Sequence, residues 1–169
     1  MINFFKKTIK TSGFSLTEVV VVIAIVGLAF VGLLETVLYD LKVSFKNQKT
    51  IQASFFAEET LESARSFRDN TDWDVDGMGA LTTGAGNFYY PVIVPGATSS
   101  AWMLASGTDT VGIFTRWLII DDVSRDQVMD DIESVYVLAN DDPDTKKVTA
   151  RVVSSSSEII LSTYLTNWR

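Results

Sequence analysis

The sequence predicts an α+β fold: one long N-terminal helix, half of it membrane-embedded, packs its C-terminal half on an antiparallel β-sheet. Three observations lead to this expectation. Residues 19–34 carry no charge, residues 35–68 contain neither proline nor glycine, and the chain after residue 88 alternates between β-branched or aromatic runs and turn residues. One long helical stretch followed by several short strands is typical of an α+β chain.

The composition already excludes several kinds of function. The chain has 169 residues, 47% of them hydrophobic, and a net charge of −7. Lys6, Lys7 and Lys10 stand in the first ten positions, so the remainder is more acidic than the whole, and we expect no nucleic-acid partner because phosphate binding needs clustered Lys and Arg. Cysteine and histidine are both absent. Their absence removes a disulfide framework, Ser-His and Cys-His catalysis, and His-ligated metals.

The N-terminal region combines a short basic segment with an apolar run. Residues 1–13 are basic and end in Thr-Ser-Gly, and residues 14–34 form a stretch of about 21 residues, roughly one bilayer span. Because the lysines come first, the positive-inside bias places the N-terminus in the cytoplasm and the C-terminal bulk outside.

Three interpretations of this region compete. A secretory signal peptide would need a cleavage site of small residues, but Glu35-Thr-Val-Leu-Tyr-Asp follows the apolar run. A plain signal anchor leaves Glu18 unexplained, since a charge in the apolar region is unfavourable. The third interpretation uses the stretch Gly13-Phe14-Ser15-Leu16-Thr17-Glu18, which closely resembles the class III signal of type IV pilins and secretion pseudopilins.

The resemblance implies a specific maturation. A prepilin peptidase would cut between Gly13 and Phe14 on the cytoplasmic side, and the same enzyme would methylate the new Phe14 amine. The membrane helix would remain in the mature chain. In the family, the carboxylate at the position of Glu18 pairs with the N-terminal ammonium of a neighbouring subunit and sets the axial register, and a buried carboxylate is tolerated when it finds such a cation.

The resemblance also implies the partners, the location and the fold. The partners would be homologous pilin subunits, the prepilin peptidase/methyltransferase, an inner-membrane assembly platform with its ATPase, and membrane lipid before assembly. The chain would begin as a single-pass precursor of the cytoplasmic membrane and end in a cell-surface or periplasmic filament. The implied fold is pilin-like, and the implied function is that of a major or minor structural subunit of a type IV pilus or a type II secretion pseudopilus.

Four regions follow from these observations: a leader at 1–13, a transmembrane or filament-core helix at 14–34, an amphipathic continuation at 35–68, and a C-terminal β-sheet region at 69–169. In the continuation, Ala53, Ala57, Leu61 and Ala64 recur at helical spacing. We expect this stripe to be core packing, with small residues that let a sheet approach the helix. Gly27 and Gly32 are expected soft points of the first half.

Residues 69–87 have the composition of a loop. Asp72, Asp74, Asp76 and Gly77 match the first half of an EF-hand calcium loop, but the twelfth position is Thr83 and not the bidentate Glu. A solvated acidic loop with Trp73 placed against the helix is the simpler interpretation. We therefore expect no cofactor and keep the three aspartates as a calcium candidate only.

The remaining chain is predicted to form strands. Turns are expected at 140–147 and 154–157, and the last two strands can pair as a hairpin. The predicted strands are residues 88–94, 101–105, 112–120, 135–139, 147–153 and 158–165.

Several features depart from the family pattern or leave alternatives open. Many type IV pilins have a proline in the helix and many close a C-terminal loop with a disulfide, and neither is possible here. An acidic cluster could in principle serve a membrane-anchored hydrolase through paired carboxylates, although a solvated surface is the more ordinary role and no catalytic motif occurs, so we expect no enzyme. A membrane-anchored extracytoplasmic binding module that does not polymerise is the other alternative. The cluster consists of Asp121, Asp122, Asp126, Asp130, Asp131 and Glu133.

Overall fold

A computed structural model describes residues 13, 15–95, 100–155 and 157–168. The chain divides into two compact units, Met1–Phe45 and Lys46–Arg169. Helix α1 (Leu16–Asn70) supplies the described helical part of the first unit and the only α-helix among the described residues of the second.

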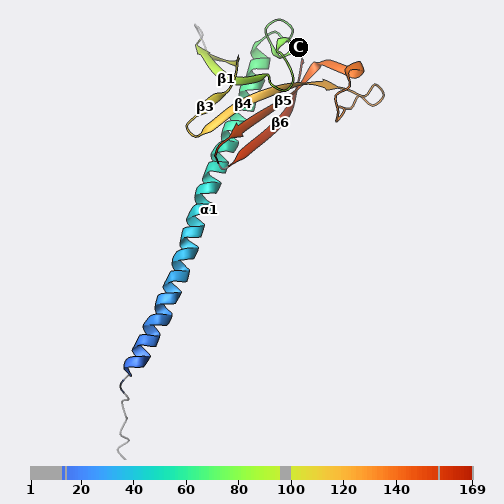
Figure 1. The fold of residues 1–169 in the computed structure, drawn as a ribbon. Helices are drawn as coiled ribbons and strands as arrows, with labels where there is room; N and C mark the ends of the chain where they lie inside the picture. Colours follow the sequence, from blue (N-terminus) through green and yellow to red (C-terminus); the bar gives the residue numbers. More distant parts are fainter. Residues whose placement is uncertain (1–12, 14, 96–99, 156, 169) are drawn as a thin grey trace, which may run out of the picture. The chain divides into compact units, whose positions relative to one another are not determined.

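The second unit contains a six-stranded sheet that follows α1 along the chain (Figure 1). All strand pairs are antiparallel, the order is β2-β1-β4-β5-β6, and β3 pairs with β4 outside this path. The predicted α+β arrangement is confirmed and is consistent with a pilin-like fold. The strands are β1 (Phe88–Pro95), β2 (Ser100–Ser106), β3 (Asp109–Val111), β4 (Phe114–Ser124), β5 (Asp141–Val153) and β6 (Glu158–Thr166).

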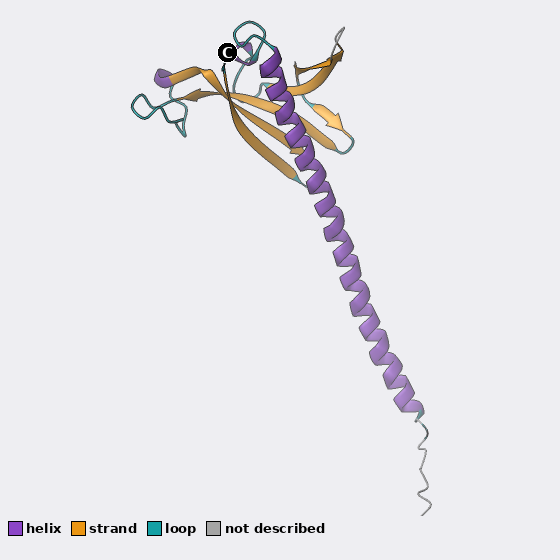
Figure 2. Ribbon diagram, turned by 180° about the vertical axis from the view of Figure 1, so that it is seen from behind, coloured by secondary structure: helices purple, strands orange, loops and turns teal. Residues whose placement is uncertain are grey.

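The last turns of α1 cover one face of this sheet (Figure 2). Ala53, Ala57 and Ala64 are fully buried, and Leu61 is nearly so, which confirms the predicted stripe. Small side chains on this face let the helix backbone approach the sheet. Phe67 supplies the largest buried side chain of the helix.

The sheet contributes its inward-pointing residues to the same core. Residues of β4 and β5 alternate between the two faces, as strand geometry requires. Leu118 and Ile120 of β4, with Val148 and Ala150 of β5, are fully buried against the helix. The antiparallel register places Leu118 opposite Ala150 and Ile120 opposite Val148.

Two charged clusters mark the ends of the buried face. Arg116 donates from Nη1 to Glu59 of α1 at 3.1 Å and from Nε to Asp109 of β3 at 2.9 Å. At the other end, Lys146 donates to Asp122 at 2.7 Å across the β4–β5 ladder. The Arg116 contacts therefore fix the helix and the short strand β3 to the same side chain.

The loop after the helix packs against the core through Trp73. This side chain is 7% exposed, and its Nε1 donates to the Pro143 carbonyl at 3.2 Å. Gly79 lies directly against the indole, since a Cβ there would stand 2.5 Å from Trp73 Nε1. The expectation that Trp73 is placed inward is confirmed.

The structure corrects the strand prediction at residues 135–139. These residues precede and enter a short 3-10 helix (Leu138–Asn140) and belong to no strand. Their β-branched composition suggested a strand, but no neighbouring strand is there to pair with them. The turn predicted at 140–147 is also wrong, because β5 already begins at Asp141 and pairs with Ser124 of β4. A register shift between Asp122 and Val123 accommodates Pro143 within this strand.

Candidate functional site

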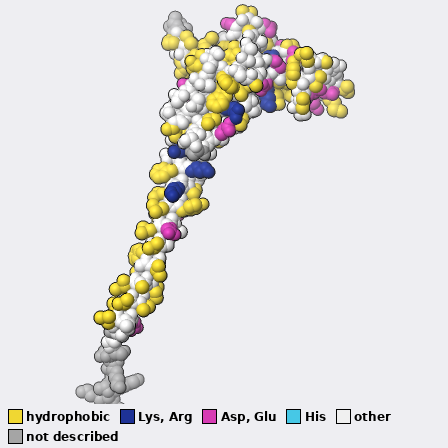
Figure 3. Space-filling model, viewed as in Figure 1, with side chains coloured by type: hydrophobic (Ala, Val, Ile, Leu, Met, Phe, Trp, Pro, Cys, Tyr) yellow, Lys and Arg dark blue, Asp and Glu magenta, His cyan; other side chains and the backbone are white. Residues whose placement is uncertain are grey.

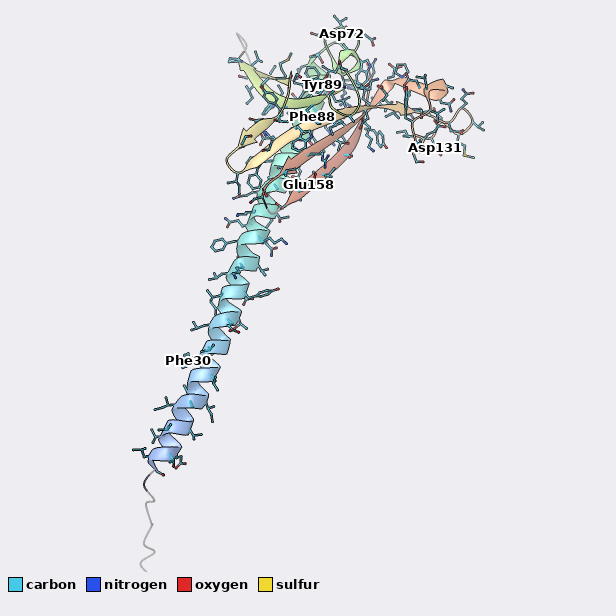
Figure 4. All side chains as sticks on the ribbon, viewed as in Figure 1. Phe30, Asp72, Phe88, Tyr89, Asp131 and Glu158 are labelled. Carbon is cyan, nitrogen blue, oxygen red and sulfur yellow. The ribbon has the colours of Figure 1, made fainter. Side chains whose placement is uncertain are left out.

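The first half of α1 is the largest feature of the chain that its own fold leaves uncovered. Within the described part of the chain, every residue from Leu16 to Gln48 is exposed. Figure 3 shows hydrophobic side chains along this part of the helix, and Phe30, labelled in Figure 4, points away from it. A contiguous apolar surface of this size needs cover by lipid or by protein.

This segment is long and apolar enough to anchor the chain in a membrane. Its most apolar 18-residue window has a mean hydropathy of 2.6, and none of that window is buried within the chain. An amphipathic core helix would have shown one covered face.

The helix begins two residues after the predicted cleavage position. The Ser15 carbonyl accepts from the Glu18 amide at 3.0 Å and from the Val19 amide at 3.2 Å, which starts the helical ladder. Ser15 Oγ lies 2.8 Å from Thr17 Oγ1. Gly13 is exposed and outside the helix, and Phe14 lies outside the described residues.

Glu18 lies in the first turn of α1 and is exposed. A carboxylate in the first turn is favourable because the helix dipole is positive there, by about 0.3–1 kcal/mol at an exposed site. Its carboxylate makes no hydrogen bond or ion pair with any described residue of the chain. The described part of the chain therefore leaves the Glu18 carboxylate available to a cation from another molecule.

The two glycines of the apolar segment do not interrupt it. The helix continues through Gly27 and Gly32, and Thr36 Oγ1 donates back to the Leu33 carbonyl at 2.8 Å. A Cβ at either glycine would meet nothing within 4 Å. Packing within this chain thus does not require these glycines, which leaves them as places where another helix can approach closely.

The calcium candidate is not assembled. Asp72, Asp74 and Asp76 lie in the loop after α1, where Asp72 Oδ1 accepts from the Asp74 amide and Asp76 Oδ1 accepts from the Asp72 amide. Across the described ranges, no three acidic side chains are grouped so that they could hold a metal ion.

The acidic cluster predicted at 121–133 is divided among separate structural tasks. Asp122 binds Lys146 and Thr83, and Asp126 Oδ1 accepts from the Val128 and Met129 amides. These two amide hydrogen bonds lower the pKa of Asp126 below its ordinary value. Asp121, Asp122 and Glu133 line one pocket together with Lys147 and Tyr164. Within it, Asp122 is paired with Lys146, and Glu133 Oε1 accepts from Asn140 at 3.1 Å.

Sequence inspection missed the role of Arg125. Its Nε donates to Asp142 at 2.5 Å, its Nη1 to the Asp130 carbonyl at 2.9 Å, and its Nη2 to Thr145 at 3.3 Å. Burial of the Asp142 carboxyl would raise its pKa, but the hydrogen bonds from Arg125 and Thr145 lower the pKa below its ordinary value. The signal in the sequence for this role was that Arg125 is the one basic residue within an acidic stretch.

Comparisons with protein-family models, curated proteins and solved structures found no match for this chain.

Proposed function

We propose that the chain is a structural subunit of a type IV pilus-like or type II secretion-like filament. The observation that carries the proposal is the uncovered apolar half of α1, which starts two residues after the Gly13–Phe14 bond and holds in its first turn Glu18, whose carboxylate has no partner among the described residues. A membrane anchor alone needs the apolar surface but has no use for the carboxylate.

The proposed sequence of events begins in the cytoplasmic membrane. The chain inserts with its N-terminus in the cytoplasm, and a prepilin peptidase hydrolyses the Gly13–Phe14 peptide bond. The exposed, side-chain-free Gly13 supports access of a protease to this bond. The new Phe14 amine, methylated by the same enzyme, is a cation that did not exist in the precursor.

Assembly then exchanges lipid contacts for protein contacts. The apolar side chains of residues 16–45 pack against the same segment of neighbouring subunits, and the Phe14 ammonium of one subunit pairs with Glu18 of another. In a low-dielectric surrounding an unpaired carboxylate is strongly unfavourable, so pairing favours the docked state and selects one axial register. An assembly platform and its ATPase supply the work.

Intact-mass measurement of the mature protein tests the processing step. We expect loss of residues 1–13 and the addition of one methyl group. An unprocessed mass, or cleavage after residue 34, would contradict the proposal.

The Glu18→Ala variant tests the assembly step. Processing should remain close to that of the parent chain, while the yield of sheared filaments should fall at least tenfold, because the register contact is lost. Glu35→Ala is the matched control, since Glu35 is an exposed carboxylate of the same helix beyond its first turn. Equal filament yield from the parent and Glu18→Ala would remove the proposed role of Glu18. The absence of sheared polymer from the parent chain itself would favour the membrane-anchored binding module instead.

A further inference from the structure

The chain between β4 and β5 forms an exposed apolar surface that the proposed function does not yet use. We name residues 126–138 the β4–β5 lobe. Four of its apolar side chains are among the most exposed of the chain: Val128 at 89%, Met129 at 76%, Val135 at 73% and Leu138 at 79%. Figure 4 places Asp131 on this lobe. Exposed apolar side chains concentrated in one short segment indicate an interaction surface.

Several hydrogen bonds hold the lobe in its conformation. At its base, the Glu133 amide donates to the Ser124 carbonyl at 2.9 Å and the Val137 amide to Ser124 Oγ at 3.0 Å. Arg125 fixes the Asp130 carbonyl, and Gln127 donates to Asn140 at 2.9 Å. The lobe is thus a built surface whose apolar side chains are presented by a defined backbone.

The lobe is also strongly acidic. Asp126, Asp130, Asp131 and Glu133 lie within it, and no Lys or Arg occurs from Asp126 to Thr145. The side chains of Asp130 and Asp131 make no hydrogen bond or ion pair with any described residue. A partner for the lobe should therefore present cations beside apolar side chains.

Helix α1 presents such a surface in this same chain. Lys46 and Lys49 are three positions apart, so they lie on one side of the helix, and Lys42 stands four positions before Lys46 on the same side. None of these lysines forms an ion pair with a described residue. Phe45, four positions before Lys49 and so on the same side of the helix, is 61% exposed.

We propose that the β4–β5 lobe of one subunit docks on the Lys46–Lys49 surface of a second copy of the chain. The inference rests on the proposed function, because the contact requires two copies of the chain to meet. Because the two surfaces differ, the contact is heterologous and can repeat from copy to copy, which builds a ring or an open filament and not a closed two-fold dimer. Charge complementarity steers the encounter, and the exposed apolar side chains of both surfaces become covered.

Charge reversal in the full-length chain tests the contact. The double variants Lys46→Glu with Lys49→Glu, and Asp130→Lys with Asp131→Lys, should each reduce sheared polymer at least tenfold. The two sets combined should restore at least half of the parental yield, because the attraction is recreated with opposite signs. Asp72→Lys with Asp74→Lys makes the same change at two exposed carboxylates outside the lobe and should keep the yield within twofold.

Other occupants predict other results. If the lysines instead bind anionic lipid, their reversal alone lowers membrane association, reversal in the lobe has no effect, and the combination does not recover polymer. If the lobe instead binds an unrelated basic protein, its reversal leaves polymer unchanged. Either pattern overturns the inference. Circular dichroism melting of each variant, expected within a few degrees of the parent, separates loss of contact from loss of folding.

Cysteine cross-linking separates this inference from the proposed function. The chain has no cysteine, so Lys46→Cys with Asp130→Cys gives a background-free pair. Oxidation in membranes should yield a ladder of oligomers, whereas Lys46→Cys with Asp74→Cys should stay monomeric. Filaments without a ladder would refute the contact and leave the proposed function standing. A ladder from an unprocessed chain that forms no filaments would support the contact and refute the proposed function. The absence of both ladder and filaments would refute the contact and the proposed function together.

Discussion

Lys146 is the residue whose charge is most deeply placed in the β-sheet unit. Its side chain is 8% exposed, and its ammonium donates to Asp122 Oδ1 at 2.7 Å. Thr83 Oγ1 donates to the other carboxylate oxygen at 2.6 Å. Burial of the Asp122 carboxyl would raise its pKa, but the hydrogen bonds from Lys146 and Thr83 outweigh this effect and lower the pKa below its ordinary value.

The first prediction concerns the pH dependence of this pair. A carboxyl whose folded-state pKa is lowered stabilises the fold above its unfolded pKa of about 4, and that stabilisation is lost as pH falls through the folded pKa. Asp122→Asn should therefore lower the free energy of unfolding at pH 7 by about 1–3 kcal/mol. It should also flatten the decline between about pH 5 and pH 2. Urea unfolding in detergent measures both effects.

Asp121→Asn is the control for this prediction. Asp121 is the neighbouring carboxylate on β4, and it forms no ion pair with a described residue. Its replacement should change stability by less than about 0.5 kcal/mol. An Asp122→Asn chain with the same pH profile as the parent would show that the pair contributes no net stability.

At the scale of elements, the small-residue face of α1 sets the distance between helix and sheet. Ala53, Ala57 and Ala64 have no exposed surface, so a longer side chain at these positions would enter the packed layer between helix and sheet. Ala57→Leu should destabilise the fold by about 1–3 kcal/mol, because an overpacked core forces strained rotamers or a backbone shift. Glu58→Leu makes a substitution to the same residue one position on, at an exposed site, and should stay within about 0.5 kcal/mol. Equal unfolding midpoints for the two variants would mean that the helix is not closely packed there.

The elements that the sequence predicted are those whose pattern is local. The helix and five of the strands follow from periodicity and composition, and the proposed cleavage motif with Glu18 rests on residues adjacent in the chain. Strand β3 was missed because three residues carry no pattern, and their position depends on pairing with β4 and on the contact of Asp109 with Arg116. Residues 135–139 were wrongly assigned because a β-branched run forms a strand only where a partner lies beside it.

The β4–β5 lobe could not be predicted as a surface for the same reason. In the sequence, Val135 and Leu138 look like core residues, and only the fold reveals that they are exposed. Conversely, Lys146 stands in a turn-like run of charged residues, yet the β4–β5 ladder buries it. Exposure depends on which distant residues meet, and a single sequence does not contain that information.

At the scale of the whole molecule, the chain joins a unit with its own core to a segment that has none. Residues 16–45 bury nothing within the chain, whereas the unit from Lys46 onward encloses two hydrophobic clusters. Stability of the fold and membrane attachment should therefore respond to different substitutions. A change confined to the apolar segment should alter where the chain resides without altering how its sheet unit unfolds.

Arginine substitutions test this separation. Val26→Arg with Phe30→Arg places two charges in the apolar segment, at about 2.5–3.5 kcal/mol each near a helix centre. The parent chain should remain in the membrane pellet after an alkaline wash, and the double variant should be released into the supernatant at least tenfold more. Phe55→Arg, at an exposed phenylalanine of the second unit, is the control and should stay in the pellet.

The fluorescence of Trp73 and the other tryptophans should report the same urea midpoint for all three chains, since the core lies outside the substituted segment. If the double variant unfolds at a lower urea concentration, the apolar segment contributes to the core, and membrane attachment and stability of the sheet unit are coupled. If it stays in the pellet with an unchanged midpoint, a surface other than residues 16–45 attaches the chain to the membrane.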